Sequence, residues 1–332
     1  MANRENTSLA ESTVGTSSIS RITPDSEPPS LVSRGGDAAL FAWEEFVFGK
    51  LRNPHTRRAY ERAIRRFLAD CEAGGCGLTN IRPRHVGTHL DGLQQTAASK
   101  KVVLSALRHF FDILVQRHVV VLNPSLSVRG ERLQVVEGST PDIGVKNARK
   151  LLSCIDAKTL VGRRDYAAIA VLIYTASRVG AVSRLRVRDF YDTGDGFALR
   201  FVEKGGKARE IPTRHDLKRR LIDYVVEAGL ADADGDTPLF RSAVGRTGKL
   251  TSNGMTAGDM NRMVKRRLKD AGLPSRLSPH SLRVTTITDL LSQGVPLEDV
   301  QHLAGHADPR TTRLYDRRGR KVTQNIVERI SI

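Results

Sequence analysis

One tyrosine near the carboxyl end of the sequence stands among arginines and follows a Gly-His pair. The segment AGHADPRTTRLYDRR carries His306 and, nine residues later, Tyr315. A phenol can act as a nucleophile, but with a pKa near 10 it is scarcely ionised at neutral pH. Tyr315 therefore needs cations and bases from elsewhere in the chain if it is to react.

A predicted helix start upstream offers both kinds of group. In SPHSLRVTTITDLLSQG, Ser278 can cap a helix whose first residue is Pro279, and His280 and Arg283 share one face of that helix. Free amide groups and the helix dipole favour an anion at such a place. The pair could therefore bind an anion and transfer a proton beside it.

Two further cations occupy defined places in the sequence. Arg178 lies in YTASRVGAVSRL, and Lys204 lies in EKGGKAREIP, where the two adjacent glycines predict the turn of a β-hairpin. The alternation of apolar residues in FALRFV predicts the first strand of this hairpin. Lys204 is therefore expected at the hairpin tip.

These fragments, taken in order, resemble the tyrosine recombinases, which are the phage-integrase family of site-specific DNA recombinases. The family pattern is Arg, Lys, His-x-x-Arg, His or Trp, and Tyr. The matching positions are Arg178, Lys204, His280, Arg283, His306 and Tyr315. The resemblance covers about Val145 to Ile332, and NPHTRRAYERAIRRFLAD with the later NPS is similar to the family's helical core-binding domain.

The resemblance implies covalent cleavage of DNA. Tyr315 would attack a phosphodiester to give a 3′-phosphotyrosine and a free 5′-hydroxyl. Arg178 and Arg283 would stabilise the charge on the nonbridging oxygens, since guanidinium groups bind phosphate as a bidentate fork. No metal ion or nucleotide cofactor is implied.

The remaining matched residues would move protons and orient the phosphate. The resemblance implies that Lys204 protonates the leaving oxygen, and His280 is the better candidate for taking the tyrosyl proton. His306 would orient the phosphate and hydrogen-bond to it.

Double-stranded DNA is the implied partner, clamped between two domains. The resemblance further implies a homotetramer on two DNA sites, strand exchange by pairs and a Holliday-junction intermediate. The resemblance also allows accessory DNA-bending proteins as partners.

Three residues near the matched positions depart from the family pattern. Ala181 stands where an acid usually follows the first arginine, Val284 stands where a second histidine often follows His-x-x-Arg, and Ala304 replaces the usual leucine before Gly-His. Arg178 is therefore expected to be held by other partners. None of the six main positions is substituted, so we expect an active enzyme.

Two other functions use the same kind of fold. A type IB topoisomerase shares the chemistry but relaxes supercoils without exchanging strands, and the compact length and integrase-like first domain argue against it. A catalytically silent DNA-binding regulator is the second alternative. The six intact positions argue against it, although Ala181 and Val284 leave it open.

The composition agrees with a polyanionic partner. The chain has 332 residues, 53 Lys and Arg against 36 Asp and Glu, and a net charge of +17, which creates an attractive field for nucleic acid. Its longest apolar run, AAIAVLI, is far shorter than the roughly 18 residues that span a bilayer. With no secretory signal evident, we expect a cytoplasmic, nucleoid-associated protein without membrane contact.

The sequence pattern of the elements that must position these residues predicts a mainly α protein with a small antiparallel β-sheet. We expect a flexible arm over 1–36, a helical core-binding domain over 37–128, a linker over 129–142, and a mixed α+β integrase-type catalytic domain over 143–332 with a helical C-terminal segment.

Apolar periodicity predicts the individual helices. They are a capped helix after Asn53, then Ala97 to Gln116, Val145 to Ile155, Asp165 into the 180s, Thr256 to Leu268, a helix from Ser278, and two short helices on either side of Gly305.

Two segments carry less specific patterns. Cys71, Cys76, His85 and His89 follow a Cys-x4-Cys-x8-His-x3-His order, but the central spacer is shorter than the roughly 12 residues of a zinc finger, so a helix end and loop are expected and no metal. VTQNIVERISI near the end of the chain has helical apolar spacing and is expected to dock on a neighbouring protomer, with a final helix on the chain's own core as the alternative.

Four arginines surround Tyr315 in the sequence. Each is either a DNA-backbone contact or a packing or solvated surface charge. They are Arg310, Arg313, Arg317 and Arg318.

Overall fold

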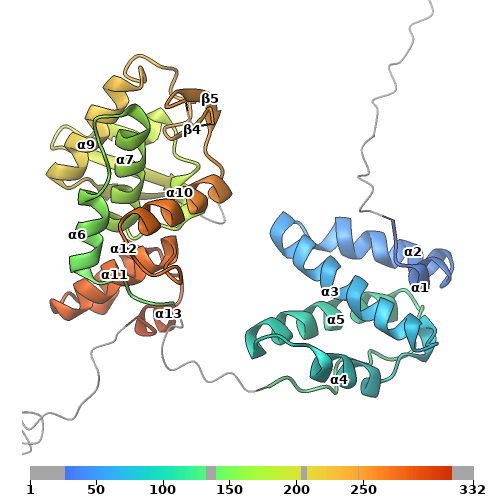
Figure 1. Ribbon diagram of the computed structural model, residues 1–332. Coiled ribbons are helices and arrows are strands. Elements are labelled where there is room, and N and C mark those ends of the chain that lie inside the picture. The colour runs from blue at the N-terminus through green and yellow to red at the C-terminus, as the bar shows by residue number, and fades with distance from the viewer. Residues whose placement is uncertain (1–26, 132–139, 203–207, 246, 316–332) are drawn as a thin grey trace, which may run out of the picture. The chain divides into compact units, whose positions relative to one another are not determined.

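The chain divides into two compact units, Met1–Gln134 and Val135–Ile332, each with its own apolar core. A computed structural model describes residues 27–131, 140–202, 208–245 and 247–315, and Figure 1 shows their helices and strands. The expected linker over 129–142 lies mostly outside the described residues, as do Lys204 and the C-terminal segment, so those expectations stay predictions.

The described residues of the first unit form helices joined by turns, with no strand. Its longer elements are α1 (Ser30–Ser33), α2 (Asp37–Glu44), a π-helical turn (Glu45–Lys50), α3 (Pro54–Ala73), α4 (Pro83–Gly92) and α5 (Ala97–Gln116). The Asn53 side chain caps α3 by accepting from the backbone N–H of His55 at 2.9 Å, directly before Pro54. The predicted helices at α3 and α5 are confirmed.

Apolar faces of α3 and α5 meet in the core of this unit. Phe67, Phe110 and Phe111 are fully buried, and the rings of Phe110 and Phe111 pack edge to face with centroids 5.6 Å apart. Each buried phenylalanine stabilises the fold by about 1.5–3 kcal/mol relative to an exposed one.

The amino-terminal boundary of this unit differs from the prediction. Residues 30–33 fall within the predicted flexible arm, but they form α1, and Leu31 and Val32 are buried in the core. A single pair of apolar residues in a Ser- and Pro-rich stretch shows no period, so the sequence pattern could not reveal this contact.

The second unit surrounds two small antiparallel sheets with helices. Its helices are α6 (Val145–Ser153), α7 (Leu160–Tyr174), α8 (Val179–Val182), α9 (His215–Glu227), α10 (Ala257–Asp270), α11 (Pro279–Ser292), α12 (Leu297–Ala304) and α13 (Pro309–Arg313). Its strands are β1 (Phe190–Asp192), β2 (Phe197–Val202), β3 (Ala208–Pro212), β4 (Arg241–Ala243) and β5 (Leu250–Gly254). This architecture confirms the mainly α class.

The predicted hairpin is present as β2 and β3, which pair antiparallel with Leu199 opposite Ile211 and Phe201 opposite Arg209. β1 adds a third strand beside β2, and β4 pairs with β5 as a second sheet that the sequence did not reveal. Strands this short carry too few alternating positions to be recognised.

The predicted helix from Asp165 into the 180s is wrong at both ends. α7 starts at Leu160, where Thr159 caps it, and stops at Tyr174. Thr175 Oγ1 lies 2.6 Å from the Val171 carbonyl oxygen and 2.8 Å from Ser177 Oγ. Such side-chain hydrogen bonds compete with helix continuation.

The chain then turns sharply at Ala176, whose φ is +48°, before α8 begins. None of the helices within the described ranges is both long and apolar enough to cross a bilayer.

α7 lies at the centre of the second unit and packs against α9 and α11. Beside α11, a separate apolar cluster contains Ala176, Val284, Ile287, Leu291, Val300, Ala304 and Tyr315. This cluster joins the end of α7, the body of α11 and the α12–α13 region, which carry the predicted site residues.

Candidate active site

Five of the six predicted site residues lie in described parts of the second unit. Arg178 precedes α8, His280 and Arg283 lie in the first turns of α11, His306 follows α12, and Tyr315 follows α13. Lys204 lies within 203–207, outside the described residues.

The start of α11 is held as the sequence predicts. Pro279 is its first residue, and the backbone N–H of Ser278 donates to Ser281 Oγ at 3.2 Å. This capping arrangement fixes the helix start, so His280 and Arg283 project from the same end of α11.

The Tyr315 hydroxyl lies 3.1 Å from Nε2 of His280, within hydrogen-bonding distance. Its ring stacks on that of His306, and the residue is only 8% exposed. Thr288 Oγ1 donates to the Tyr315 carbonyl at 3.2 Å, which ties the segment after α13 to α11. Tyr315 is thus held between two imidazoles.

His306 is oriented by the turn that ends α12. Gly305 has a left-handed backbone with φ of +64°, as a helix-terminating glycine commonly does. His306 Nδ1 lies 2.9 Å from Thr312 Oγ1, and Gln301 Nε2 donates to the His306 carbonyl at 3.0 Å. The imidazole is buried, with 6% of the residue exposed.

Arg283 is a buried cation with spare hydrogen-bond donors. It is 1% exposed, and its Nη1 donates to the Ala176 carbonyl. Among the described residues, Nε and Nη2 are buried without a hydrogen-bond partner. Leaving buried donors unpaired costs about 1–3 kcal/mol each, so their presence indicates a site built to receive an anion.

Arg178 is exposed and forms no side-chain hydrogen bond or ion pair with a described residue. The family's usual acid is replaced here by Ala181, which brings no carboxylate to it. Arg178 nevertheless lies close enough to lower the pKa values of His280, Arg283 and His306. It therefore belongs to the same electrostatic cluster.

Burial and the two arginines keep both imidazoles neutral. Partial desolvation, then Arg283 and Arg178, lower the pKa of His280 below its ordinary value. Burial, then the same arginines, lower the pKa of His306 to about 3. Burial and Arg178 lower the pKa of Arg283 to about 10, so it remains cationic at neutral pH.

Two departures from the family pattern have an apolar role here. Val284 and Ala304 are buried in the cluster that contains Tyr315. Val284 is therefore part of the apolar cluster around Tyr315, at a position where a polar histidine often stands in the family.

Sequence reasoning missed one polar residue in this region. Arg209 on β3 is buried, and it contributes to the lowered pKa values of Arg283 and His306. Strand alternation could have identified it, because alternate residues of β3 share a face and Arg209 lies on the same inward face as Ile211.

Two of the four arginines near Tyr315, Arg310 and Arg313, lie in the described residues. Arg310 is exposed and pairs with Asp308 at 3.0 Å, and Arg313 is exposed. Arg317 and Arg318 lie outside the described residues.

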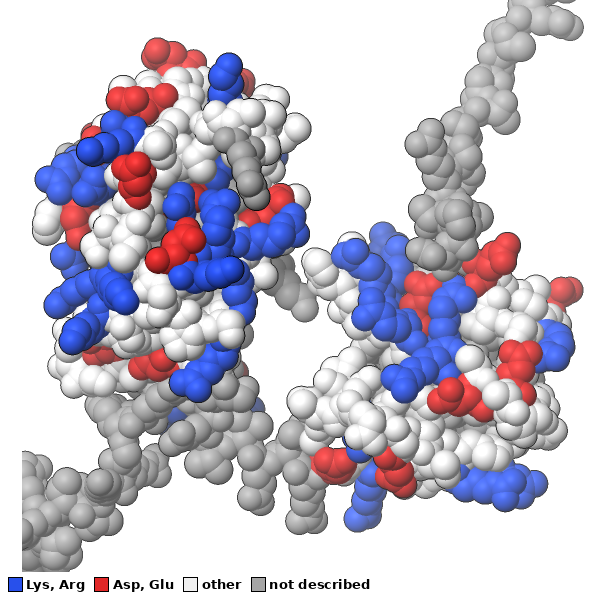
Figure 2. Space-filling model, in the orientation of Figure 1, with Lys and Arg blue, Asp and Glu red and all other residues white. Residues whose placement is uncertain are grey.

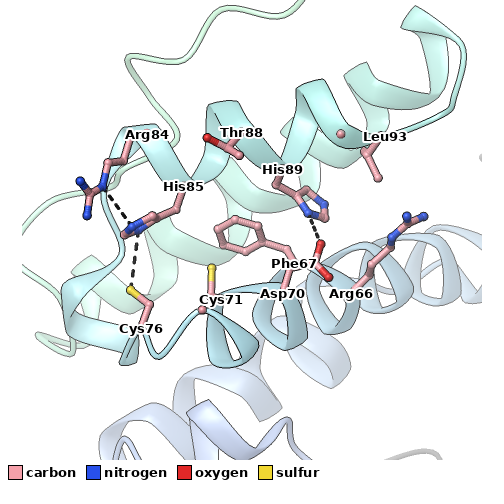
Figure 3. Close-up of a pocket in the computed structure, with 12 residues that line it drawn as sticks. Arg66, Phe67, Asp70, Cys71, Cys76, Arg84, His85, Thr88, His89 and Leu93 are labelled. Carbon is pink, nitrogen blue, oxygen red and sulfur yellow. Dashed lines mark hydrogen bonds and ion pairs between the residues drawn. The ribbon is translucent and has the colours of Figure 1, made fainter.

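The Cys-His order in the first unit does not form one ligand cluster. A cavity of about 450 Å³ lies between α3 and α4, and Figure 3 shows residues that line it. There His89 Nδ1 lies 2.7 Å from Asp70 Oδ2, and Cys76 Sγ lies 3.7 Å from His85 Nδ1. Burial raises the pKa of the Cys71 thiol to about 12. No group of three or more suitable side chains is arranged for a metal ion in the described parts of the chain.

Positive charge is spread over both units. Figure 2 shows groups of Lys and Arg side chains on the visible face of each. On α3, three arginines are exposed: Arg58, Arg62 and Arg66.

The chain is similar to known recombinases over most of its length. The profile described as "Phage integrase family" matches residues 143–320, and that described as "Phage integrase, N-terminal SAM-like domain" matches residues 42–118. A tyrosine recombinase XerD from Listeria monocytogenes is 30% identical over 271 residues, covering 79% of this chain and 87% of the relative. A tyrosine recombinase XerC from Pelobacter propionicus is 28% identical, covering 79% and 84%.

Solved structures share the fold. A lambda integrase dimer bound to a COC′ core site has a TM-score of 0.66 at 20% identity, covering 89% of this chain and 79% of that one. XerH recombinase bound to a difH substrate has a TM-score of 0.65 at 18% identity, covering 90% and 92%. The chain therefore belongs to the phage integrase family and is a site-specific recombinase of the tyrosine type.

Proposed function

We propose that this recombinase cleaves and rejoins DNA through Tyr315. The observation that carries the proposal is the Tyr315 hydroxyl 3.1 Å from His280 Nε2, with the buried Arg283 nearby, two of whose nitrogens have no hydrogen-bond partner among the described residues. A nucleophile, a neutral base and an anion-binding guanidinium thus lie together, which is what attack on a phosphodiester requires.

In this mechanism the Tyr315 oxygen bonds to phosphorus while the bond from phosphorus to the 5′ oxygen breaks. His280 takes the phenolic proton, because it is neutral and within reach. Arg178 and Arg283 stabilise the charge on the nonbridging oxygens, and His306 orients the phosphate. The product is a 3′-phosphotyrosine, and attack by a 5′-hydroxyl reverses the step.

Lys204 is proposed as the acid that protonates the leaving 5′ oxygen. This role rests on the resemblance of EKGGKAREIP to the family pattern, since the residue lies outside the described part of the chain.

The proposed substrate is double-stranded DNA, bound by four protomers across two sites. The net charge of +17 supports a polyanionic partner. A lambda integrase tetramer has been solved on a Holliday junction, and its fold is similar to this chain at a TM-score of 0.62 and 20% identity. We extend that assembly to this protein as part of the proposal.

A nicked suicide duplex tests the chemistry. Repeats that flank the gene supply candidate sites, and the nick lets the short cleaved strand diffuse away, so that rejoining is prevented. We expect a denaturant-resistant protein–DNA adduct, with the DNA attached to the peptide that contains Tyr315. Attachment at another residue, or no adduct on any site that the protein binds, would contradict the proposal.

Strand exchange is tested separately with two intact sites. We expect recombinant products and a four-way junction intermediate. An adduct accompanied by relaxation of supercoils, without exchange, would favour topoisomerase activity instead.

A further inference from the structure

Arg209 joins two segments that carry site residues. It lies on β3, is 8% exposed, and its Nη2 donates to Ser177 Oγ at 3.0 Å. Its Nη1 donates to the backbone carbonyl of Leu303. One guanidinium thus links the segment before α8 to the last turn of α12.

Each of these contacts lies beside a proposed catalytic residue. Ser177 immediately precedes Arg178, and Leu303 lies in the turn that ends at Gly305 and leads to His306. The planar guanidinium has donors in fixed directions, so it can hold two acceptors at a set separation. Movement of either segment would break one of these hydrogen bonds.

The guanidinium is itself held in place. Its carbon lies 5.4 Å from the centroid of the Phe201 ring, and Phe201 is the cross-strand neighbour of Arg209 on β2. The small sheet therefore provides a rigid base for the link.

From these contacts we infer that Arg209 is a positioning residue for DNA cleavage, holding the segments of Arg178 and His306 at the separation that the phosphate requires. This inference rests on the proposed function of the site. It assigns Arg209 no contact with DNA and no proton transfer.

An apolar side chain would be the usual occupant of such an inward strand position, as Ile211 is two residues later. Burying a guanidinium there carries a desolvation cost, which its hydrogen bonds must offset. Its charge also contributes to the low pKa values of Arg283 and His306. Arg209 can therefore act through its hydrogen bonds or through its charge, and the two effects can be separated by experiment.

The test compares three variants with wild type in single-turnover cleavage of the suicide duplex. Arg209→Met removes the charge and the hydrogen bonds to Ser177 and Leu303, and we expect a loss of about 100-fold, as for a misplaced reacting group. Arg209→Lys keeps the charge but carries all its donors on one nitrogen of a flexible stem. It should therefore not hold the two acceptors at the spacing that the planar guanidinium spans, and should recover only part of the rate. The matched control is Arg200→Met, because Arg200 is exposed on β2 and stacks over Tyr191, and it should cleave at the wild-type rate.

DNA affinity and thermal unfolding of each variant are measured alongside, and rates are taken well below the melting temperature. Full activity in folded Arg209→Met, or full recovery in Arg209→Lys, would overturn the positioning role. In the second case the charge alone would account for the effect.

A double-mutant cycle keeps the inference testable if Arg209→Met folds poorly. Ser177→Ala removes one acceptor of the link and should lower the cleavage rate. We expect the loss for Ser177→Ala combined with Arg209→Lys to be smaller than the product of the two separate losses, because both disturb the same link. Independent effects would contradict it.

The imidazole ¹⁵N signals of His306 separate this inference from the proposed function. They should shift in Arg209→Met and remain in place in Arg200→Met, whether or not DNA is cleaved. If wild type forms no adduct, the proposed function fails while the His306 signals still test the link. If wild type forms the adduct and neither rate nor signals change in Arg209→Met, only the Arg209 inference fails.

Discussion

The rings of His306 and Tyr315 are stacked, with centroids 5.5 Å apart and planes inclined by 17°. α13 connects the two residues, and its start is set by the Asp308 side chain, which accepts from the backbone N–H of Arg310 at 2.9 Å. Because Nδ1 of His306 bonds to Thr312, its Nε2 is the nitrogen left to meet a ligand. Local turn geometry therefore orients an imidazole and a phenol together.

Replacement of Tyr315 by phenylalanine should abolish the covalent adduct while preserving DNA affinity. The ring can still pack in its apolar cluster, but the attacking oxygen is absent. Electrophoresis under denaturing conditions measures the adduct, and mobility shift measures binding. The control is Tyr191→Phe, which removes a hydroxyl that bonds to Glu210 on the sheet. This variant should still form the covalent adduct. An adduct from Tyr315→Phe would identify another nucleophile.

The two arginines of the site should each be needed for cleavage. Arg178→Ala and Arg283→Lys are expected to lower the single-turnover rate by about 10²–10³-fold, the usual cost of losing one oxyanion donor. Lysine is preferred at Arg283 because it keeps a cation in a buried place. Arg214→Ala removes one exposed charge from the same unit and serves as the control for nonspecific DNA attraction. A wild-type rate for either site variant would remove that residue from the mechanism.

The acid limb of the cleavage rate should have its midpoint below pH 6.5, the ordinary imidazole value, because the pKa of His280 is lowered by partial desolvation, Arg283 and Arg178. Protonation of His280 below that midpoint removes the base and slows the reaction. Arg178→Ala takes away one lowering charge, so its residual activity should decline at a higher pH than wild type. The pH dependence of single-turnover rates measures both. A wild-type midpoint above pH 6.5 would argue against His280 as the base.

Stability should fall in acid partly because of His306. Its pKa is about 3 in the folded protein, against an ordinary value of 6.5, because the buried ring resists protonation. Between these values the unfolded chain binds a proton that the folded chain does not, so the free energy of unfolding decreases as the pH falls from 6.5 towards 3.

Denaturant unfolding at a series of pH values measures how steeply the free energy of unfolding decreases as the pH falls. This slope should be shallower in His306→Gln and unchanged in His302→Gln, since His302 is exposed on α12. Equal slopes in wild type and His306→Gln would show that the imidazole is not buried in its neutral form.

Ala176 should tolerate glycine unusually well for a buried residue. Its φ of +48° costs a side-chain-bearing residue about 1–2 kcal/mol, which offsets the lost methyl contact and the greater freedom of glycine in the unfolded chain. We expect Ala176→Gly to change the free energy of unfolding by less than about 1 kcal/mol. Ala170→Gly, within α7, should cost about 2 kcal/mol. Equal losses at the two positions would contradict the strained backbone.

Local signals in the sequence predicted the helices well where periodicity was long or capping was explicit. The Asn53-Pro54 and Ser278-Pro279 starts, and the stop at Gly305, appear in the structure as expected. These features depend on interactions within a few residues, which is why a sequence reveals them. The end of α7 was missed because an apolar pattern shows neither the hydroxyl bonds of Thr175 and Ser177 nor the positive φ of Ala176.

The sequence by itself determined which functional groups are available and in what order they occur. It also determined that His280 and Arg283 lie near the start of a helix. Only the tertiary structure decided that Tyr315 lies against His280, that Arg283 is buried, and that Arg209 connects two distant segments. The reason is physical: a desolvated charge and a lowered pKa arise from contacts among segments far apart in the chain, and no local spacing encodes them.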